Sequence, residues 1–447
     1  MTKTICLINP WIHDFAAYDF WSKPIGLLSL AAILRKNGHR VRFIDCLNPR
    51  HPFMEADPGI KTPKRRKWGN GNYYKESIEK PATLSDFPRR YSRYGIGPDI
   101  LREELAALER LDMVFVTSMM TYWYPGVCET IDITREARPG ATIVLGGNYA
   151  TLCTDHARHH AGADIIVTGE GERELPGLCD MPYFMPDHAD LDSYPYPAFD
   201  LLASLDQVPI MTSRGCPFRC TYCASHILND GFRVRDPIRV VDEIAFWHAS
   251  HGVMNFAIYD DAFLVDAENR AIPMLKEIIR RNLQVNFHCP NGLHLREIGE
   301  EVSRLMFQSG FRTIRFGFET SSVKRQMETG GKITNEETIA AVRHLQQAGY
   351  RSSDIGIYIL CGLPGQTAAE VHNSIVFIQS LGARPVIAEY SPIPGTPLWD
   401  KSVSLSPFNI AEEPLFHNNT LLPCRSDRLT YAMYRALKDE TRSQQYE

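Results

Sequence analysis

Three cysteines stand within eight residues of this 447-residue chain, at Cys216, Cys220 and Cys223. Thiolates this close together can hold three corners of an iron–sulfur cube, and such clusters are usually held by four cysteine thiolates. No fourth cysteine follows nearby, so one iron is left open for a small-molecule ligand. The spacing therefore predicts a single loop that holds a cluster with one open coordination site.

This motif resembles that of the radical S-adenosylmethionine (radical SAM) superfamily, in which an aromatic residue also precedes the last cysteine, here Tyr222. The resemblance implies that the open iron binds SAM and that an electron from a [4Fe-4S] cluster cleaves SAM to a 5′-deoxyadenosyl radical. It further implies that Tyr222 packs against adenine and that a reducing donor of the flavodoxin or ferredoxin type serves the cluster. The cofactors carry the difficult chemistry, and the protein supplies placement and electrostatics.

A zinc site with His226 as the fourth ligand is the alternative interpretation of the same cysteines. The remaining cysteines are scattered singly through the chain: Cys6, Cys46, Cys128, Cys153, Cys179, Cys289, Cys361 and Cys424. That scatter indicates reduced core thiols and no disulfide framework. Because no secretory signal opens the sequence, we expect a cytoplasmic location.

The composition, with 44% hydrophobic residues and a net charge of −5, is typical of soluble globular domains. No apolar run approaches the roughly 18 residues of a membrane-spanning helix, so we expect no membrane integration. The slight negative charge argues against nucleic acid as a partner. A basic segment at residues 61–67 stands inside an expected insertion at about 49–95. We expect a solvated insertion there, with a lid or a surface for an anionic partner as the alternative.

Apolar strand-like runs alternate with helical segments in the N-terminal part, which predicts an α/β fold with a doubly wound, Rossmann-like parallel sheet. The expected strands are residues 4–9, 41–46, 113–118, 142–145 and 164–168, with a helix at 26–36. Sheets of this kind bind ligands at the carboxyl ends of their strands. Ser118, Gly146 and Gly147 stand at those ends.

The strand ends resemble the cobalamin (B12)-binding domain found ahead of many radical SAM domains, over residues 1–180. The resemblance implies cobalamin as a cofactor, with Ser118 meeting its nucleotide tail. Gly146 and Gly147 would let the backbone approach the bulky ligand. The alternative is a plain strand-to-helix turn in which Ser118 caps the helix. The loop after the first strand lacks the D-x-H-x-x-G pattern of domains that ligate cobalt from below. Its single histidine is His13.

Proline and aromatic residues crowd residues 181–205, which predicts a linker. From 206 to 400 a serial strand–helix repeat predicts a partial (βα)6 barrel of the TIM type, with chemistry at the carboxyl ends of its strands. Six units resemble the open barrel of radical SAM domains. The expected strands are 209–213, 255–259, 284–289, 313–318, 354–360 and 386–390, with helices at 237–249, 298–309 and 336–348. Residues 401–447 form a C-terminal extension with one expected helix at 426–441.

Carboxylates follow two of these barrel strands. Asp260 and Asp261 follow the second strand, and Glu319 ends the fourth. We expect them to accept hydrogen bonds from the amino group or ribose of SAM, because a carboxylate at a barrel mouth needs a partner. The alternatives are a helix cap or turn for the aspartates and a salt bridge from Glu319 to Arg315 or Lys324.

Gly362 and Gly365 follow the fifth strand, in a segment that resembles the family's glycine-rich turn near SAM. A plain turn is the alternative. Cys289 and Cys361 stand near the expected barrel mouth, but their apolar strand contexts favour inert core thiols.

These features predict a radical SAM enzyme with an N-terminal cobalamin-binding-like domain and a small-molecule substrate. The resemblance favours cobalamin-dependent methylation of an unactivated carbon. Rearrangement, cyclisation or oxidation without cobalamin is the alternative within the same superfamily. From another class, the chain would be a non-catalytic Fe–S or zinc binding module.

Overall fold

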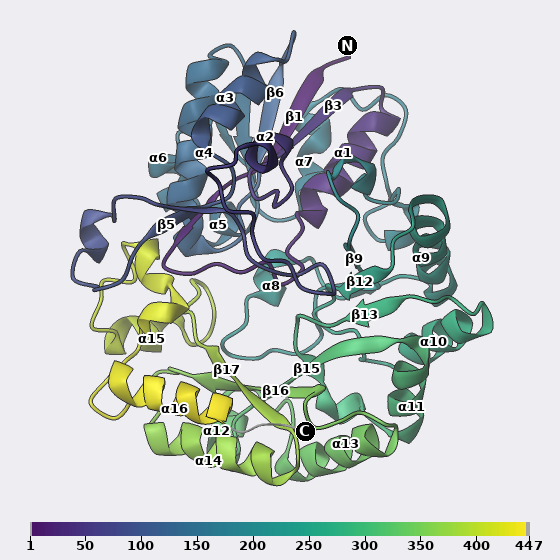
Figure 1. Ribbon diagram of the computed structural model, residues 1–447, viewed down its shortest axis with the longest axis vertical. Helices are drawn as coiled ribbons and strands as arrows, with labels where there is room; N and C mark the ends of the chain where they lie inside the picture. Colours follow the sequence, from purple (N-terminus) through teal and green to yellow (C-terminus); the bar gives the residue numbers. More distant parts are fainter. Residues whose placement is uncertain (1, 444–447) are drawn as a thin grey trace. The chain divides into compact units, whose positions relative to one another are not determined.

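The computed structural model of the protein describes residues 2–443. The chain divides between Gln207 and Val208 into two compact units, coloured purple to blue-green and green to yellow in Figure 1. The division falls just after the proline-rich stretch that was expected to be a linker. No helix among the described residues is long and apolar enough to cross a membrane.

The first unit is built on a parallel five-stranded sheet in the order β3-β1-β6-β7-β8. Its strands are β1 (Thr4–Asn9), β3 (Arg40–Asp45), β6 (Met113–Val116), β7 (Thr142–Leu145) and β8 (Ile165–Ile166). The predicted Rossmann-like sheet is therefore confirmed. The strand order reverses between β1 and β6, and the crevice at such a reversal is where doubly wound sheets bind ligands.

Alternate residues of β1 enter two different apolar cores, one on each face of the sheet. Ile5 and Leu7 pack on the face covered by α1 (Ile25–Lys36) and α7 (Gly171–Leu178). Cys6 and Ile8 pack on the face covered by helices α3 (Pro98–Ala106) and α4 (Tyr124–Ala137). Strands buried on both faces read as continuous apolar runs, which is why their positions are visible in the sequence.

The insertion at about 49–95 folds onto the first unit. It contributes β4 (Lys75–Ser77) and β5 (Ser92–Tyr94) to a three-stranded antiparallel sheet, in which the central β5 pairs with β4 on one side and with β2 (Ile12–Asp14) on the other. Arg65 bridges back to Asp19 at 2.5 Å, although its neighbours in the basic segment are exposed. Three-residue strands carry too little pattern to be predicted from sequence.

The second unit is an open parallel barrel whose strands follow one another in chain order, with helices along the outer side (Figure 1). The strands are β9 (Val208–Ile210), β12 (Asn255–Ile258), β13 (Asn286–His288), β15 (Phe311–Glu319), β16 (Ile355–Cys361) and β17 (Arg384–Glu389), with short β14 (Leu293–His294) beside β15. The helices between them are α9 (Pro237–His251), α10 (Ala271–Arg280), α11 (Glu300–Ser309), α13 (Asn335–Gln347) and α14 (Ala368–Ser380). The expected partial barrel is therefore confirmed.

The C-terminal extension packs on the last strand. It contains α15 (Trp399–Leu405) and α16 (Tyr431–Ser443). Lys438 of α16 reaches the Glu389 carboxylate at the end of β17 at 2.5 Å. The expected helix at 426–441 begins later, because Ser426 and Leu429 pair with each other in a turn.

Candidate cofactor site

The cysteine loop leaves the barrel after β9 and is closed at its base by a short antiparallel pair, β10 (Ser213–Arg214) and β11 (Arg233–Val234). Gly215 sits in this closure with φ +78°, and a Cβ there would lie 2.1 Å from the Gly231 carbonyl oxygen. Only glycine allows this approach of two backbones. The loop is thus held as one folded piece and ends at α8 (Ser225–Leu228).

Burial raises the pKa of all three loop thiols, to about 11 for Cys216. Cys220 is buried, while Cys216 and Cys223 are partly exposed. The backbone N–H of Ser225 donates to the Cys223 sulfur at 3.4 Å, a contact that favours the thiolate. Iron binding would therefore displace a proton from each thiol, and the loop fits a group that takes three thiolates.

Among residues 2–443, no group of three or more His, Cys, Asp or Glu side chains is arranged to hold a single metal ion. A cube takes each thiolate on a different iron, so its ligands do not converge on one ion. The zinc interpretation with His226 stays an untested alternative.

The cysteine loop rests on the segment that follows α12 (Val323–Glu328). The backbone N–H of Thr221 donates to the Thr329 carbonyl at 3.3 Å, and its hydroxyl donates to the Glu328 carbonyl at 3.1 Å. On the other side, the Leu398 N–H donates to the Thr221 carbonyl at 3.0 Å. The loop is therefore fastened between α12 and the chain that enters α15.

Tyr222 places its hydroxyl in hydrogen-bonding contact with the Cys220 thiol and the Glu319 carboxylate, and burial raises its pKa. Its ring packs against the apolar cluster that contains Leu360 and Tyr390. The tyrosine thus links the cysteine loop to the end of β15. Stacking of its ring on adenine stays a prediction.

Glu319 ends β15 with φ +74°, an unusual value for a non-glycine residue, where the pairing register with β16 shifts. Its carboxylate is 3.4 Å from the Lys332 ammonium, so the alternative partners Arg315 and Lys324 are wrong. A Cβ on Gly317 would lie 2.5 Å from the Lys332 Nζ and 2.7 Å from the Glu319 Oε1. The glycine therefore makes room for this ion pair at the barrel mouth.

The Asp260 carboxylate accepts several hydrogen bonds from other groups of the protein. It accepts hydrogen bonds from the Thr212 N–H at 2.9 Å, the Thr212 hydroxyl at 2.5 Å and the Ser213 hydroxyl at 2.6 Å. Arg270 lies 3.7 Å away. Asp260 is thereby placed to join the start of the cysteine loop to the end of β12, a structural role that competes with the predicted role in SAM binding.

Asp261 is the more open of the two aspartates. It is exposed, and it accepts a hydrogen bond of 2.5 Å from the Ser225 hydroxyl directly after the cysteine loop. Of this pair, Asp261 is the better placed to meet a ligand of the cluster.

Gln366 shapes the glycine turn after β16. Its side-chain oxygen accepts hydrogen bonds from the backbone N–H groups of Gly362 at 2.8 Å and Leu363 at 3.2 Å, and its amide donates to the Leu360 carbonyl at 2.9 Å. Gly362 and Gly365 have φ values of +97° and +72°. Both glycines are thus required by the turn itself, and their approach to SAM stays a prediction.

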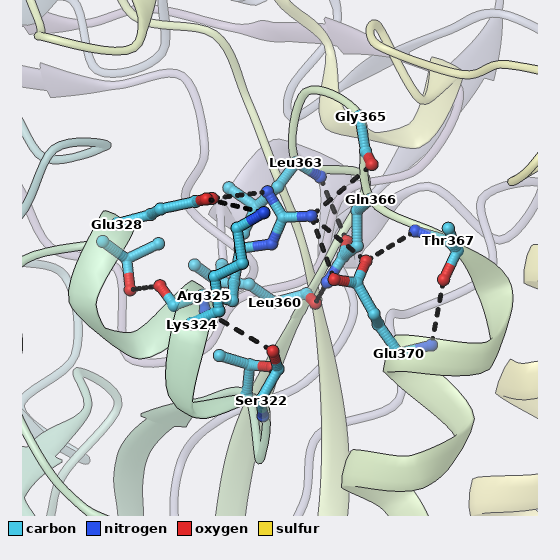
Figure 2. A network of polar contacts seen from close by, with 12 residues as sticks. Ser322, Lys324, Arg325, Glu328, Leu360, Leu363, Gly365, Gln366, Thr367 and Glu370 are labelled. Atoms are coloured by element: carbon cyan, nitrogen blue, oxygen red, sulfur yellow. Dashed lines mark hydrogen bonds and ion pairs between the residues drawn. The ribbon is translucent and has the colours of Figure 1, made fainter.

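Figure 2 shows how Arg325 of α12 joins this turn to the first turn of α14. One guanidinium nitrogen lies 3.1 Å from each Glu370 carboxylate oxygen and 3.5 Å from the Gly365 carbonyl, and another lies 3.2 Å from Glu328. Glu370 also completes the capping box with Thr367 at the start of α14. The helix that supports the cysteine loop thus also supports the glycine turn.

In the first unit, Ser118 caps α5 (Asn148–Leu152). Its hydroxyl donates to the Gly146 carbonyl at 2.8 Å and accepts from the Tyr149 N–H at 3.2 Å. Gly147 has φ +92°, and a Cβ there would lie 2.3 Å from the Ser118 carbonyl oxygen, whereas Gly146 has no close neighbour. Ser118 and Gly147 therefore form the strand-to-helix turn, and their contacts with cobalamin stay predictions.

Two exposed methionines lie after the carboxyl end of β6, where the strand order reverses. Met119 and Met120 are separated from β6 by Thr117 and Ser118 and are 37% and 40% exposed. His13, which lies nearby in sequence to β1, pairs its Nε2 with Glu129 of α4 at 2.8 Å. This histidine is thus engaged by a carboxylate of the protein.

Four residues that support the predicted ones were not expected from the sequence, namely Lys332, Gln366, Arg325 and Gly330, of which Gly330 lies against the Cys220 main chain. A signal existed for three of them. Gly330-Gly331-Lys332 is a paired glycine before a cation, and Gln366 stands in the glycine turn itself. Their partners, however, are distant in sequence or lie in the backbone, which no local pattern reveals.

Two family profiles match the chain. That of the Radical SAM superfamily matches residues 210–378, and that of the B12 binding domain matches residues 95–179. An uncharacterized methyltransferase of Pyrococcus horikoshii is 27% identical over 348 residues, which cover 69% of this chain and 74% of the relative. The cytidylyl-2-hydroxyethylphosphonate methyltransferase of Streptomyces wedmorensis is 22% identical, covering 85% and 78%.

Among solved structures, the radical SAM methyltransferase TsrM of Kitasatospora setae, with cobalamin and a [4Fe-4S] cluster bound, has the same fold with a TM-score of 0.66. The two chains are 18% identical, and the match covers 91% of this chain and 79% of TsrM.

The chain carries a radical SAM domain over residues 210–378 and a B12 binding domain ahead of it, over residues 95–179. It is therefore an enzyme whose cofactors are a [4Fe-4S] cluster, SAM and cobalamin. Cys216, Cys220 and Cys223 lie inside the matched radical SAM region.

Proposed function

We propose that this protein is a cobalamin-dependent radical SAM methyltransferase that methylates an unactivated carbon of a small-molecule substrate. The observation that carries the proposal is the order of the two matched domains in one chain, with the B12 binding domain directly ahead of the radical SAM domain. Two relatives that span more than two thirds of this chain are named methyltransferases, which supports methyl transfer as the outcome.

The protein's own residues bind and orient these groups. Cys216, Cys220 and Cys223 would hold three irons of the cluster. When bound, the cluster and SAM supply radical chemistry, and cobalamin supplies a methyl group. The Glu319–Lys332 pair offers one charge of each sign to the amino acid portion of SAM, and the apolar cluster around Leu360 excludes water beside the cysteine loop.

A second outcome is supported by another relative. The anaerobic magnesium-protoporphyrin IX monomethyl ester cyclase of Cereibacter sphaeroides is 25% identical over 67% of this chain and 54% of the relative. Cyclisation or oxidation on the same scaffold is therefore the second candidate. In either case we propose a cytoplasmic enzyme whose cluster is reduced by a flavodoxin- or ferredoxin-type donor.

The test is to reconstitute the protein anaerobically with iron, sulfide and methylcobalamin, add SAM and a strong reductant, and separate the nucleoside products. Deoxyadenosine with S-adenosylhomocysteine is expected. Formation of deoxyadenosine alone would overturn methyl transfer and favour the second candidate. If neither product forms, the result favours a binding module. Cys220→Ala should lose cluster and products together, while Cys128→Ala, outside the loop, should keep both.

A further inference from the structure

Two arginines face each other across a glycine inside the barrel. Arg315 of β15 is aligned with Gly356 of β16, and Gly356 is aligned with Arg384 of β17. Neighbouring strands lie about 4.8 Å apart, and aligned residues of parallel strands point to the same face. A Cβ on Gly356 would lie 2.6 Å from the Arg315 Nη1, so the guanidinium lies over the glycine. Because Gly356 has no side chain to separate them, the Arg315 and Arg384 guanidinium groups lie close to each other.

The arginines project away from the helices that cover the barrel. The residues on either side of Arg315, Ile314 and Phe316, are fully buried on the opposite face, and Phe318 stacks on Phe377 of α14. Tyr358 stands two residues after Gly356 on the same face as the arginines and is influenced electrostatically by both. The pair therefore lies on the inner face of the barrel.

Neither guanidinium forms an ion pair with a carboxylate in the described part of the chain. Arg315 donates only to its neighbour's carbonyl, Ile314 O, at 2.8 Å. The Nε of Arg384 is buried without a hydrogen-bond partner. Burial and the nearby Arg384 charge lower the pKa of Arg315 to about 10. By contrast, the Lys332 ammonium forms an ion pair with the Glu319 carboxylate.

Two partly buried like charges without a counterion repel each other and destabilise the folded state. An oxyanion bound between the two guanidinium groups would replace this repulsion with attraction. Planar guanidinium groups suit the two oxygens of a carboxylate or a phosphate-type group. Glu319 lies four residues further along β15, about 13 Å away at the rise of a parallel strand. A ligand held at the arginines would thus extend along the inner face toward the barrel mouth.

We infer that Arg315 and Arg384 together bind an oxyanionic group of the substrate, a carboxylate or a phosphate-type oxyanion. The assignment to a substrate rests on the proposed function, whereas the anion site itself rests on the uncompensated arginine pair. The substrate class is then an acid whose charged end is held four residues before Glu319 along β15.

The test uses the full chain without cofactors and follows thermal unfolding and calorimetric binding with two probes, inorganic phosphate and succinate, at constant ionic strength. Wild type should bind at least one probe, and Arg315→Met and Arg384→Met should each weaken that binding at least tenfold. Arg312→Met is the matched control, because Arg312 is exposed and alternates to the other face of the same strand. Without any probe, Arg384→Met should unfold at a higher temperature than wild type, because it removes the repulsion.

Equal stabilisation of all four proteins by a probe would show general ionic binding and overturn the site, as would the absence of binding to wild type. Binding of phosphate but not of succinate would assign a phosphate-type group to the substrate. Binding of succinate but not of phosphate would assign a carboxylate. If wild type binds a probe through the arginines but forms no deoxyadenosine after reconstitution, the proposed function fails and the anion site stands.

Discussion

Gly330 lies directly against the main chain of Cys220. A Cβ on Gly330 would come within 3.1 Å of the Cys220 Cα, and Gly330 has φ +117°, outside the region that other residues adopt. The neighbouring Gly331 also has a positive φ, of +61°, but its nearest atom is 4.0 Å away. The support under the cysteine loop is thus shaped by the first of these two glycines.

Gly330→Ala should therefore displace the cysteine loop and lower the iron bound after reconstitution, with a loss of about 1–3 kcal/mol in the free energy of unfolding. Gly331→Ala is the matched control, because Gly331 also has a positive φ but does not contact the Cys220 main chain. Iron and sulfide per chain and urea unfolding report the result. Full iron content in Gly330→Ala would contradict the assigned support.

Gln366→Leu should destabilise the protein by about 3 kcal/mol, because two backbone N–H groups and one carbonyl lose their partner in a buried turn. We expect weaker SAM binding as well, since the turn loses its shape. Gln347→Leu, at an exposed position of α13, serves as the control. Urea unfolding checks stability, and calorimetry checks SAM binding; an unchanged unfolding midpoint would refute the role of Gln366.

Glu129 gives a pH dependence to the stability of the first unit. Burial alone would raise its pKa, but hydrogen bonds from His13 and Arg93 outweigh burial and lower the pKa from 4.5 to about 2. A carboxyl whose pKa is lowered by folding stabilises the fold above its unfolded pKa, and that stabilisation is lost as the pH falls through the folded value. With the side chain 25% exposed, the contribution is about 2 kcal/mol.

Glu129→Gln should therefore be less stable than wild type at pH 6, and the difference should shrink steadily as the pH falls below 4.5. Urea unfolding of both proteins at several pH values measures it. A difference that does not change with pH would show that Glu129 acts by shape alone.

Gln207 should behave in the opposite way to Gln366. It is 2% exposed, and both its side-chain oxygen and nitrogen lack a hydrogen-bond partner. It borders a shallow surface pocket in the first unit, beside the Arg50–Asp206 ion pair. Replacing an unpartnered buried amide with an apolar group of similar size is neutral or stabilising. Gln207→Leu should thus keep or raise the unfolding temperature, and a clear fall would show that the amide is satisfied in solution.

The strands of both units could be predicted because their buried residues form apolar runs in the sequence. Residues 4–9 and 142–145 match β1 and β7, and the end of β15 at Glu319 was also expected. Parallel strands covered on both faces are nearly continuous apolar runs, which are visible without knowledge of their neighbours. The cysteine triplet was equally visible, because its chemistry depends on local spacing.

The supporting contacts could not be predicted for a related reason. Lys332 meets Glu319 where the register of β15 shifts, and Arg325 of α12 meets Glu370 of α14. Asp260, a polar residue after a strand, accepts hydrogen bonds from Thr212 and Ser213 in the segment that follows β9. Sequence patterns place a residue on an element, whereas these roles depend on which elements become neighbours.

The bonds on both sides of Thr221 also set an order of events during synthesis. Its hydroxyl bonds to Glu328, 107 residues later in the chain, and its carbonyl bonds to Leu398, later still. As a chain leaves the ribosome from its N-terminus, the cysteine loop emerges long before either partner. We therefore expect the three thiols to remain loosely held until translation is nearly complete, so that cluster loading is a late event and a chain truncated before Leu398 is open to thiol oxidation.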